Sequence, residues 1–366
     1  MVAVPATPPP APAPAPTGPA PKFTFGGLVD TYYLFNFTPP TGANTLAFPG
    51  PALPDGIGGT VAAGVGRAFD TSANSITLAL AKLSMNAALD PVAFQLDIGY
   101  GSVPSIISGS PGAPSFMVEQ AYATISLPAN LTLDFGKFVT TAGAEVIEAK
   151  SNWLYSRSLL FNIIPFLHTG VRAGLKVNDQ VTLQASLVNG WNNDPDLNAW
   201  KTIGLSGTFT INPMISLIAT TYFGKEAIQG AMPSTPNDVR VLGDLVAAVT
   251  VNSQFGLNLN VDYIKAFDDV AGDYQIGAAL MGRYVISDRL NVAARGEFVA
   301  THFDAAATTI KQGEGTVMLG IDVGKNFELR PEIRADFAGQ VMGLDLLEGG
   351  TKSDAITGEL AALAWF

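Results

Sequence analysis

The feature that most constrains this chain is a regular alternation of short turns and long connections between extended runs that begin at Phe23. The runs are about ten residues long, which exceeds the roughly 5–6 residues common in soluble strands and matches the ~9–11 residues of a strand that crosses a bilayer. The short turns lie at 90–91, 128–130, 178–179, 212–213, 252–254, 287–289 and 325–326. The long connections lie near 38–73, 101–115, 140–166, 192–199, 225–239, 268–273, 303–315 and 340–353. These breaks predict sixteen strands, with every short turn and both chain ends on the same side.

Many of these runs alternate between apolar and polar residues, as a strand with two different faces does. In ELRPEIRADF, residues 328–337, charged side chains occupy one face, and Leu329, Ile333 and Phe337 lie on the other. Pro331 weakens this strand assignment, because proline removes a ladder hydrogen bond. A soluble sandwich would expose the charges to water, whereas a membrane barrel would place the apolar row in lipid.

Two runs, 23–37 and 74–89, are ambiguous. In the second, three apolar residues fall on the same face as Lys82, namely Ile76, Leu78 and Leu80. A β-bulge would explain this break in the alternation, and so would an apolar patch packed inside the lumen.

Composition alone fits both settings, but the length of the runs, their even number and the placement of the short turns favour the membrane. The chain is 48% hydrophobic and 14% charged, against roughly 25% charged residues in a typical soluble domain. No apolar run approaches the ~20 residues of a membrane-spanning helix. In lipid every backbone donor and acceptor needs an internal partner, so a sheet must close on itself. We therefore predict an all-β membrane protein, in which residues 23–366 form a closed antiparallel barrel of about 16 strands with short periplasmic turns and long extracellular loops.

The composition also excludes several other classes of protein. The chain has no cysteine, which excludes disulfide frameworks, zinc ribbons and thiol chemistry. The two histidines, His168 and His302, lie far apart in the sequence, and neither a metal site nor a cofactor is expected. A net charge of −11 argues against a nucleic-acid partner.

Residues 1–22 form an Ala/Pro-rich segment that is expected to be disordered. Proline removes backbone donors and favours extended polyproline II, so the segment reads as a spacer. A contact with a periplasmic partner or the cell wall is the alternative. The start of the chain has neither the basic nor the apolar region of a signal peptide. If the protein is exported, this sequence is expected to be its mature form.

The central segment at 140–179 resembles a known family. It contains GAEVIE (143–148), Trp153, YSRS (155–158) and HTGVRAG (168–174). In these elements the chain resembles the OmpL-like β-barrel porins. The last strand ends on Phe366, and a terminal aromatic residue on an amphipathic strand is similar to the recognition signal of outer-membrane barrels. The resemblance implies an outer-membrane porin that passes small solutes, without naming a solute.

The third long connection, residues 140–166, is the first candidate site. Ala144–Lys150 is expected to form a helical turn, which would place Glu145 and Glu148 on one face. A sixteen-strand barrel is wide enough for an aqueous channel, and a long loop folded inside it would narrow the lumen. With the resemblance, this predicts a constriction made of Glu145, Glu148, Lys150 and Arg157. The alternative is an ordinary extracellular loop whose charges are solvated.

Charged residues on the inward faces of other strands are candidates for the pore wall. They are His168, Arg172, Lys176, Arg283, Arg295, Glu297, Arg330, Glu332 and Arg334. Mixed charge across a narrow water path would set ion selectivity and orient dipolar solutes. Alternatively, these residues pair with neighbouring charges and hold the wall rigid; the two roles are compatible.

The sequence therefore predicts a porin of the bacterial outer membrane that allows passive diffusion of ions and small hydrophilic solutes. Its expected partners are outer-membrane lipid and these solutes, and the resemblance permits a homotrimer. The acidic net charge predicts a mild cation preference. Two alternatives stay open: a closed barrel acting as a structural anchor or adhesin, and an outer-membrane hydrolase using His302 and Asp304. No nucleophile stands beside these two residues, so an enzyme is not expected.

Overall fold

The computed structural model describes residues 22–38, 67–108, 114–196, 198–226, 238–267, 273–303, 308–339 and 353–366. Apart from Lys22, the spacer predicted at 1–22 lies outside the described residues. The first eight strands are β1 (Lys22–Asn36), β2 (Ile76–Ala88), β3 (Val92–Gly101), β4 (Ser115–Leu127), β5 (Leu131–Val139), β6 (Leu167–Lys176), β7 (Val181–Val188) and β8 (Thr202–Asn212). The other eight are β9 (Ile215–Glu226), β10 (Asp238–Thr250), β11 (Phe255–Phe267), β12 (Tyr274–Ser287), β13 (Leu290–Phe303), β14 (Thr308–Asp322), β15 (Phe327–Ala338) and β16 (Asp354–Trp365). Three short helical segments are α1 (Ser102–Ile107), η1 (Ala149–Ser151) and α2 (Leu159–Ile163).

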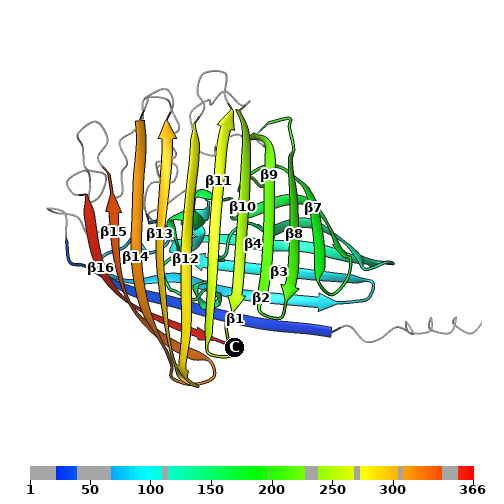
Figure 1. Ribbon diagram of the computed structural model, residues 1–366. Coiled ribbons are helices and arrows are strands. Elements are labelled where there is room, and N and C mark those ends of the chain that lie inside the picture. Colours follow the sequence, from blue (N-terminus) through cyan, green and yellow to red (C-terminus); the bar gives the residue numbers. More distant parts are fainter. Residues whose placement is uncertain are drawn as a thin grey trace, which may run out of the picture.

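These strands form one closed antiparallel barrel, in which each strand pairs with its sequence neighbours and β1 pairs with β16 (Figure 1). The last residue of the chain completes the wall. Gly27 N donates to Phe366 O at 3.2 Å, and Phe366 N donates to Gly27 O at 3.1 Å. The prediction of a closed barrel of sixteen strands is confirmed. In the described part of the chain, no helix is both long and apolar enough to cross a membrane.

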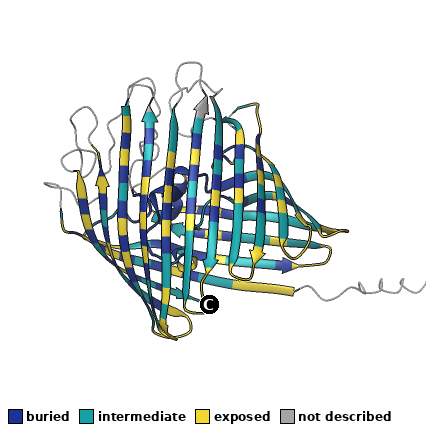
Figure 2. Ribbon diagram, in the orientation of Figure 1, coloured by how far each residue is buried: buried dark blue, intermediate teal, exposed yellow. Residues whose placement is uncertain are grey.

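The wall has two chemically different faces, visible in Figure 2 as buried and exposed bands along the strands. On β15 the inward Glu332 and Arg334 are 3% and 1% exposed, whereas the outward Ile333 is 63% exposed. The alternation of ELRPEIRADF therefore places its charges inside the barrel and its apolar row outside, as expected for a barrel in lipid.

A β-bulge explains the irregular pattern of the second strand. The β1–β2 register pairs Asp30 with Leu80 but Thr31 with Leu78, so Ala79 is the extra residue. Beyond this bulge Ile76 lies outside and is 81% exposed, whereas Leu80 is fully buried. Leu80 and Lys82 therefore both face the interior. Both explanations of the irregular pattern apply, because the strand has a bulge and also an apolar side chain that points inward.

Pro331 is accommodated by a local break in one ladder. It remains opposite Leu360 of β16. The β14–β15 ladder pairs Met318 with Glu332 and resumes only at Ile321 with Leu329. The missing N–H of proline thus costs pairing with one neighbour only.

Two predicted connections contain regular structure. The expected loop at 303–315 was too long, because β14 begins at Thr308 and pairs with β13 from its first residue. Two glycines, Gly313 and Gly315, hide this strand in the sequence, and cross-strand pairing overrides their weak strand propensity. The connection at 101–115 begins with the short helix α1.

Two glycines on different strands, Gly136 and Gly315, offer a test of how tightly the wall is packed. Gly136 on β5 has a φ of +133°, and a Cβ there would lie 2.2 Å from the Ala121 carbonyl oxygen of β4. Gly136→Ala should therefore lower the free energy of unfolding by about 1–3 kcal/mol. Gly315→Ala on β14 is the control, because its Cβ would meet no atom within 4 Å. The temperature at which the folded band disappears in electrophoresis measures the stability of both variants. Equal stability of the two variants would contradict this account.

Candidate functional site

The segment between β5 and β6, residues 140–166, lies against the inward face of the barrel and forms the centre of the candidate site. Its first residues contact β9 and β11: Thr141 Oγ1 lies 3.0 Å from the Tyr222 hydroxyl, and Ala144 N donates to Asn260 Oδ1 at 2.9 Å. Both wall residues are buried. We refer to residues 140–166 below as the inner loop.

Charged side chains of β15 bind the backbone of the inner loop. Arg330 Nη1 donates to the carbonyl oxygens of Ala149 at 2.7 Å and Asn152 at 3.1 Å, and its Nη2 donates to that of Lys150 at 3.2 Å. These carbonyls surround the single turn η1. The planar fork of arginine suits several acceptors at once, so one side chain fixes the turn against the wall.

The next two inward charges of β15 continue this pattern. Glu332 accepts hydrogen bonds from Tyr155 N at 2.8 Å and Ser156 N at 3.2 Å. Arg334 Nη1 donates to the Arg157 carbonyl oxygen at 2.7 Å. Because side chains repeat on one face every second residue, alternating cations and anions on β15 match successive carbonyl and N–H groups of the loop.

Two of the four predicted constriction residues are buried inside the loop–wall contact. Glu145 is 5% exposed, accepts from Ser158 N at 2.8 Å, and pairs with Arg295 of β13 at 2.9 Å. Arg157 is 2% exposed, donates to the carbonyl oxygens of Ile147 and Tyr155, and covers the ring of Phe69.

The other two predicted residues, Glu148 and Lys150, are partly accessible. Glu148 pairs with Lys82 of β2. Burial by itself would raise the pKa of Glu148, but the pairing with the Lys82 ammonium group outweighs this effect. The pKa of Glu148 therefore lies below its usual value of 4.5. Lys150 is exposed, and its Nζ lies 4.4 Å from the ring centre of Trp365. A cavity of about 230 Å³ lies between the loop and the walls here. Its lining includes Lys82, Ser84, Glu148, Lys150, Ser151 and Trp365.

The expected helical turn at Ala144–Lys150 is wrong. The backbone is irregular before Ala149, where the short turn η1 begins, and α2 forms only at Leu159–Ile163. Glu145 pairs with Arg295 of β13, whereas Glu148 pairs with Lys82 of β2. Glu145 and Glu148 therefore have different partners, although their spacing of three would align them on a helix.

The predicted wall residues fall into three groups. Arg295, Glu297, Arg330, Glu332 and Arg334 hold the inner loop, with Glu297 accepting from Leu159 N at 2.6 Å. Arg172 pairs with Asp134 at 2.8 Å, and His168 stacks on Tyr222 and bonds the Gly190 carbonyl. Lys176 pairs with Asp179 beside a turn, and Arg283 donates to Asn291 at 3.3 Å.

Sequence reasoning missed a second inward segment, at 67–73. Arg67 donates to Thr357 at 2.6 Å and to Glu359 at 2.9 Å, and it pairs with Asp70. Burial would raise the pKa of Asp70, but the Arg67 guanidinium holds it well below its usual value. Phe69 packs against both Phe161 and Phe166 of the inner loop, with ring centres 5.4 Å from each. No local motif marks this segment, because its partners lie far away in the sequence.

Lys82 was also missed as a site residue. Its ammonium lies 2.7 Å from Glu119 and 3.3 Å from Asp97, and it contacts Glu148 of the inner loop. The break in alternation around Lys82 was the available signal, because an unexplained lysine on an apolar face needs a buried partner.

The interior is asymmetric in charge. β7 and β8 carry no ionisable residue, and most of their inward side chains are hydroxyl and amide groups. These include Thr182, Gln184, Ser186, Ser206, Thr208 and Thr210. The inner loop binds the opposite, charged wall of β13 and β15. In the described residues, no three His, Asp or Glu side chains converge as metal ligands.

Comparison with known proteins gives one family. The model of the family described as "Putative beta-barrel porin-2, OmpL-like" matches residues 22–366. No curated protein matches the chain.

Several solved structures share the fold. The anion-selective porin from Comamonas acidovorans has a TM-score of 0.64 at 10% identity, covering 95% of this chain and 100% of its own. OmpT of Vibrio cholerae, folded in vitro and in trimer form, has a TM-score of 0.61 at 12% identity, covering 95% and 100%. The outer-membrane channel DcaP of Acinetobacter baumannii has a TM-score of 0.59 at 12% identity, covering 94% and 97%.

The Arg330 contacts predict where a protease can cut the inner loop once these contacts are weakened. Arg330→Lys keeps the charge but loses the fork, so η1 should detach and trypsin should cut after Lys150 in the folded barrel. We expect a loss of about 1–3 kcal/mol in stability as well. Arg283→Lys is the matched control, because Arg283 donates to wall residue Asn291. Mass spectrometry of tryptic fragments identifies the cut; resistance in Arg330→Lys would show that the contact does not anchor the turn.

The pKa of Glu148 predicts a pH dependence. Because its folded-state pKa lies below 4.5, the pair with Lys82 stabilises the fold fully above that value and loses this effect as the pH falls through the lower value. Wild type should thus unfold at a higher temperature than Glu148→Gln at pH 7, and the difference should shrink at pH 3. Calorimetry in detergent measures this; an unchanged difference at pH 3 would contradict it.

Proposed function

The chain belongs to the family of OmpL-like β-barrel porins, and we propose from this premise that it lets ions and small hydrophilic solutes diffuse passively across the bacterial outer membrane. The observation that carries the proposal is the fixed position of the inner loop. Multiple charged hydrogen bonds hold it against β13 and β15, whereas β7 and β8 face the interior with uncharged polar groups. Such a wall solvates a passing solute without binding it strongly.

We propose that the narrow part of the path is bounded by the accessible part of the inner loop. Glu148 and Lys150 border a cavity, whereas Glu145 and Arg157 are buried in contacts with the wall and the loop. The buried pair would therefore act on the shape of the path, and the accessible pair on its charge.

We further propose a preference for cations. Lys82 is surrounded by three carboxylates, those of Asp97, Glu119 and Glu148; Asp97 and Glu119 are buried, and Glu148 is the one that borders the cavity and places negative charge there. Acidic side chains beside a narrow water path concentrate cations. The Comamonas relative is anion-selective by its name, but at 10% identity its likeness concerns the fold.

Planar-bilayer recording of the purified protein under a salt gradient tests this function. We expect discrete open steps and a reversal potential that favours cations. Glu148→Gln should move the reversal potential towards anions, and Lys150→Gln should move it towards cations. Glu145→Gln, whose side chain is buried against Arg295, should leave selectivity almost unchanged while lowering stability.

The outcomes separate the remaining functions. Silence from an inserted, folded barrel would favour a closed anchor or adhesin over a channel. A reversal potential favouring anions would overturn the cation preference alone.

Assembly as a homotrimer is also part of the proposal, since OmpT has a trimer form; chemical cross-linking in detergent measures it. A role of residues 1–22 in contacts with the cell wall or periplasmic partners stays a prediction.

A further inference from the structure

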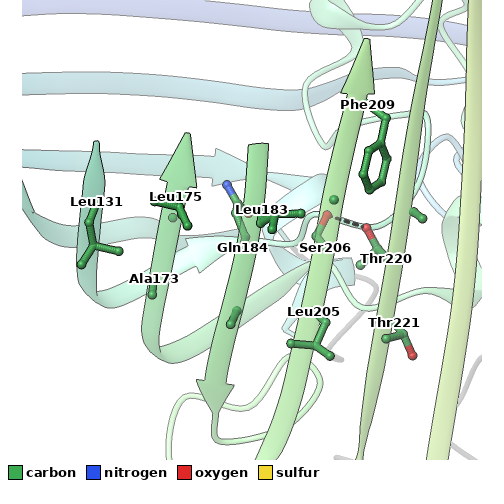
Figure 3. Close-up of a pocket in the computed structure, with 14 residues that line it drawn as sticks. Leu131, Ala173, Leu175, Leu183, Gln184, Leu205, Ser206, Phe209, Thr220 and Thr221 are labelled. Atoms are coloured by element: carbon green, nitrogen blue, oxygen red, sulfur yellow. Dashed lines mark hydrogen bonds between the residues drawn. The ribbon is translucent and has the colours of Figure 1, made fainter. Parts of the chain in front are cut away.

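The outer wall carries an apolar hollow that the channel function does not use. It has a volume of about 580 Å³ and spans β5 to β9. Figure 3 shows Leu131, Leu175, Leu183 and Leu205 on four neighbouring strands around it. The last three of these leucines are 37%, 40% and 48% exposed and lie on the lipid side of the wall.

Small residues create the hollow. Ala173, Ala185 and Ala219 lie on the outward face of β6, β7 and β9 and line it. Gly207 of β8 also lines it, and a Cβ there would lie 2.7 Å from the ring of Phe209. Phe209 therefore folds over the glycine and borders the space left by the alanines. The lining exposes almost only carbon, so an occupant must be apolar at this height.

The extracellular ends of two of these strands carry cations on the same outward face. Lys201 stands just before β8, and its side chain is 44% exposed. Lys225 lies one residue before the end of β9, with its Nζ 4.7 Å from the ring centre of Trp200, which is 56% exposed. Lysine and tryptophan at the end of an apolar band are typical of the headgroup level of a membrane.

Carboxylates balance part of this charge. Asp194 pairs with Lys137 of β5, and Asp196 pairs with Lys201. Lys225 has no carboxylate partner among the described residues, so it leaves this edge with a net positive charge.

We propose that this face binds one membrane lipid with an anionic phosphate headgroup. The phosphate would contact Lys225 and Lys201 beside Trp200, and an acyl chain would fill the hollow. Leu205 follows Lys201 by four residues, which is about 13 Å along a strand, so one molecule reaches both places. The inference concerns the outer wall and stands apart from conduction through the interior.

Charge complementarity favours a lipid over a second copy of this chain. Among the described strand residues, the ionised side chains on the outward face are Lys137, Lys225, Lys265, Lys311 and Asp354. A second barrel would thus oppose the lysines of this edge mainly with further lysines, whereas a phosphate neutralises them.

Native mass spectrometry of the detergent-purified protein tests the proposal with dioleoylphosphatidic acid as the probe. Dioleoylglycerol has the same chains without phosphate, and inorganic phosphate has no chains; we expect neither to be retained. Lys225→Gln should weaken retention of the phosphatidic acid by about fivefold. Ala185→Phe, which fills the hollow, should abolish it.

Two control variants keep the test specific. Ala278→Phe and Lys311→Gln change the outward face of β12 and β14, away from the hollow, and should retain the lipid like wild type. Equal losses in the controls would mean non-specific lipid around the barrel and would overturn the site. So would full retention in Ala185→Phe. If that variant instead dissociates an oligomer without changing lipid retention, the face is an interface between copies and the lipid proposal is wrong.

Discussion

The rest of the structure depends on pairing the backbone hydrogen-bonding groups of the wall with one another. A bilayer offers no donors or acceptors to an open sheet edge, so a transmembrane sheet is stable only when it closes. In this chain the closure falls between β1 and β16, where Gly27 and the terminal Phe366 exchange two hydrogen bonds. Once the wall is closed, the parity of each strand decides which side chains meet lipid and which meet the interior.

Closure also buries charged side chains inside the barrel, and the inner loop provides partners for them. The inward parity brings many charges into a confined space, and a buried charge is costly unless it is paired and hydrogen-bonded. Arg330, Glu332 and Arg334 meet this requirement through backbone groups of the loop. The same contacts stabilise the charges and fix the loop. The position of the inner loop thus follows from the electrostatics of the wall.

Sequence reasoning placed the candidate site in residues 140–166 but did not predict which partners its charges contact. One hypothesis from the sequence is that the wall arginines pair with neighbouring charges and hold the wall rigid. Arg295, Arg330 and Arg334 do contact neighbouring carboxylates, and they also donate to backbone carbonyls of the inner loop. Glu145 and Glu148 were expected on one helical face and instead contact Arg295 and Lys82. A spacing of three residues has meaning only on a helix, and tertiary contacts prevented a helix here.

The sequence by itself determined the number of strands, their long span, the placement of short turns and the faces of clearly alternating strands such as β15. These properties are local: a period of two residues and a turn residue act within a few positions. The tertiary structure alone decided that Lys82 meets Glu148, that Arg67 inserts beside Glu359, and that alanines on separate strands leave one hollow in the outer wall. Each of these contacts joins distant segments, and their distance is set by strand register and barrel closure, which no local pattern encodes.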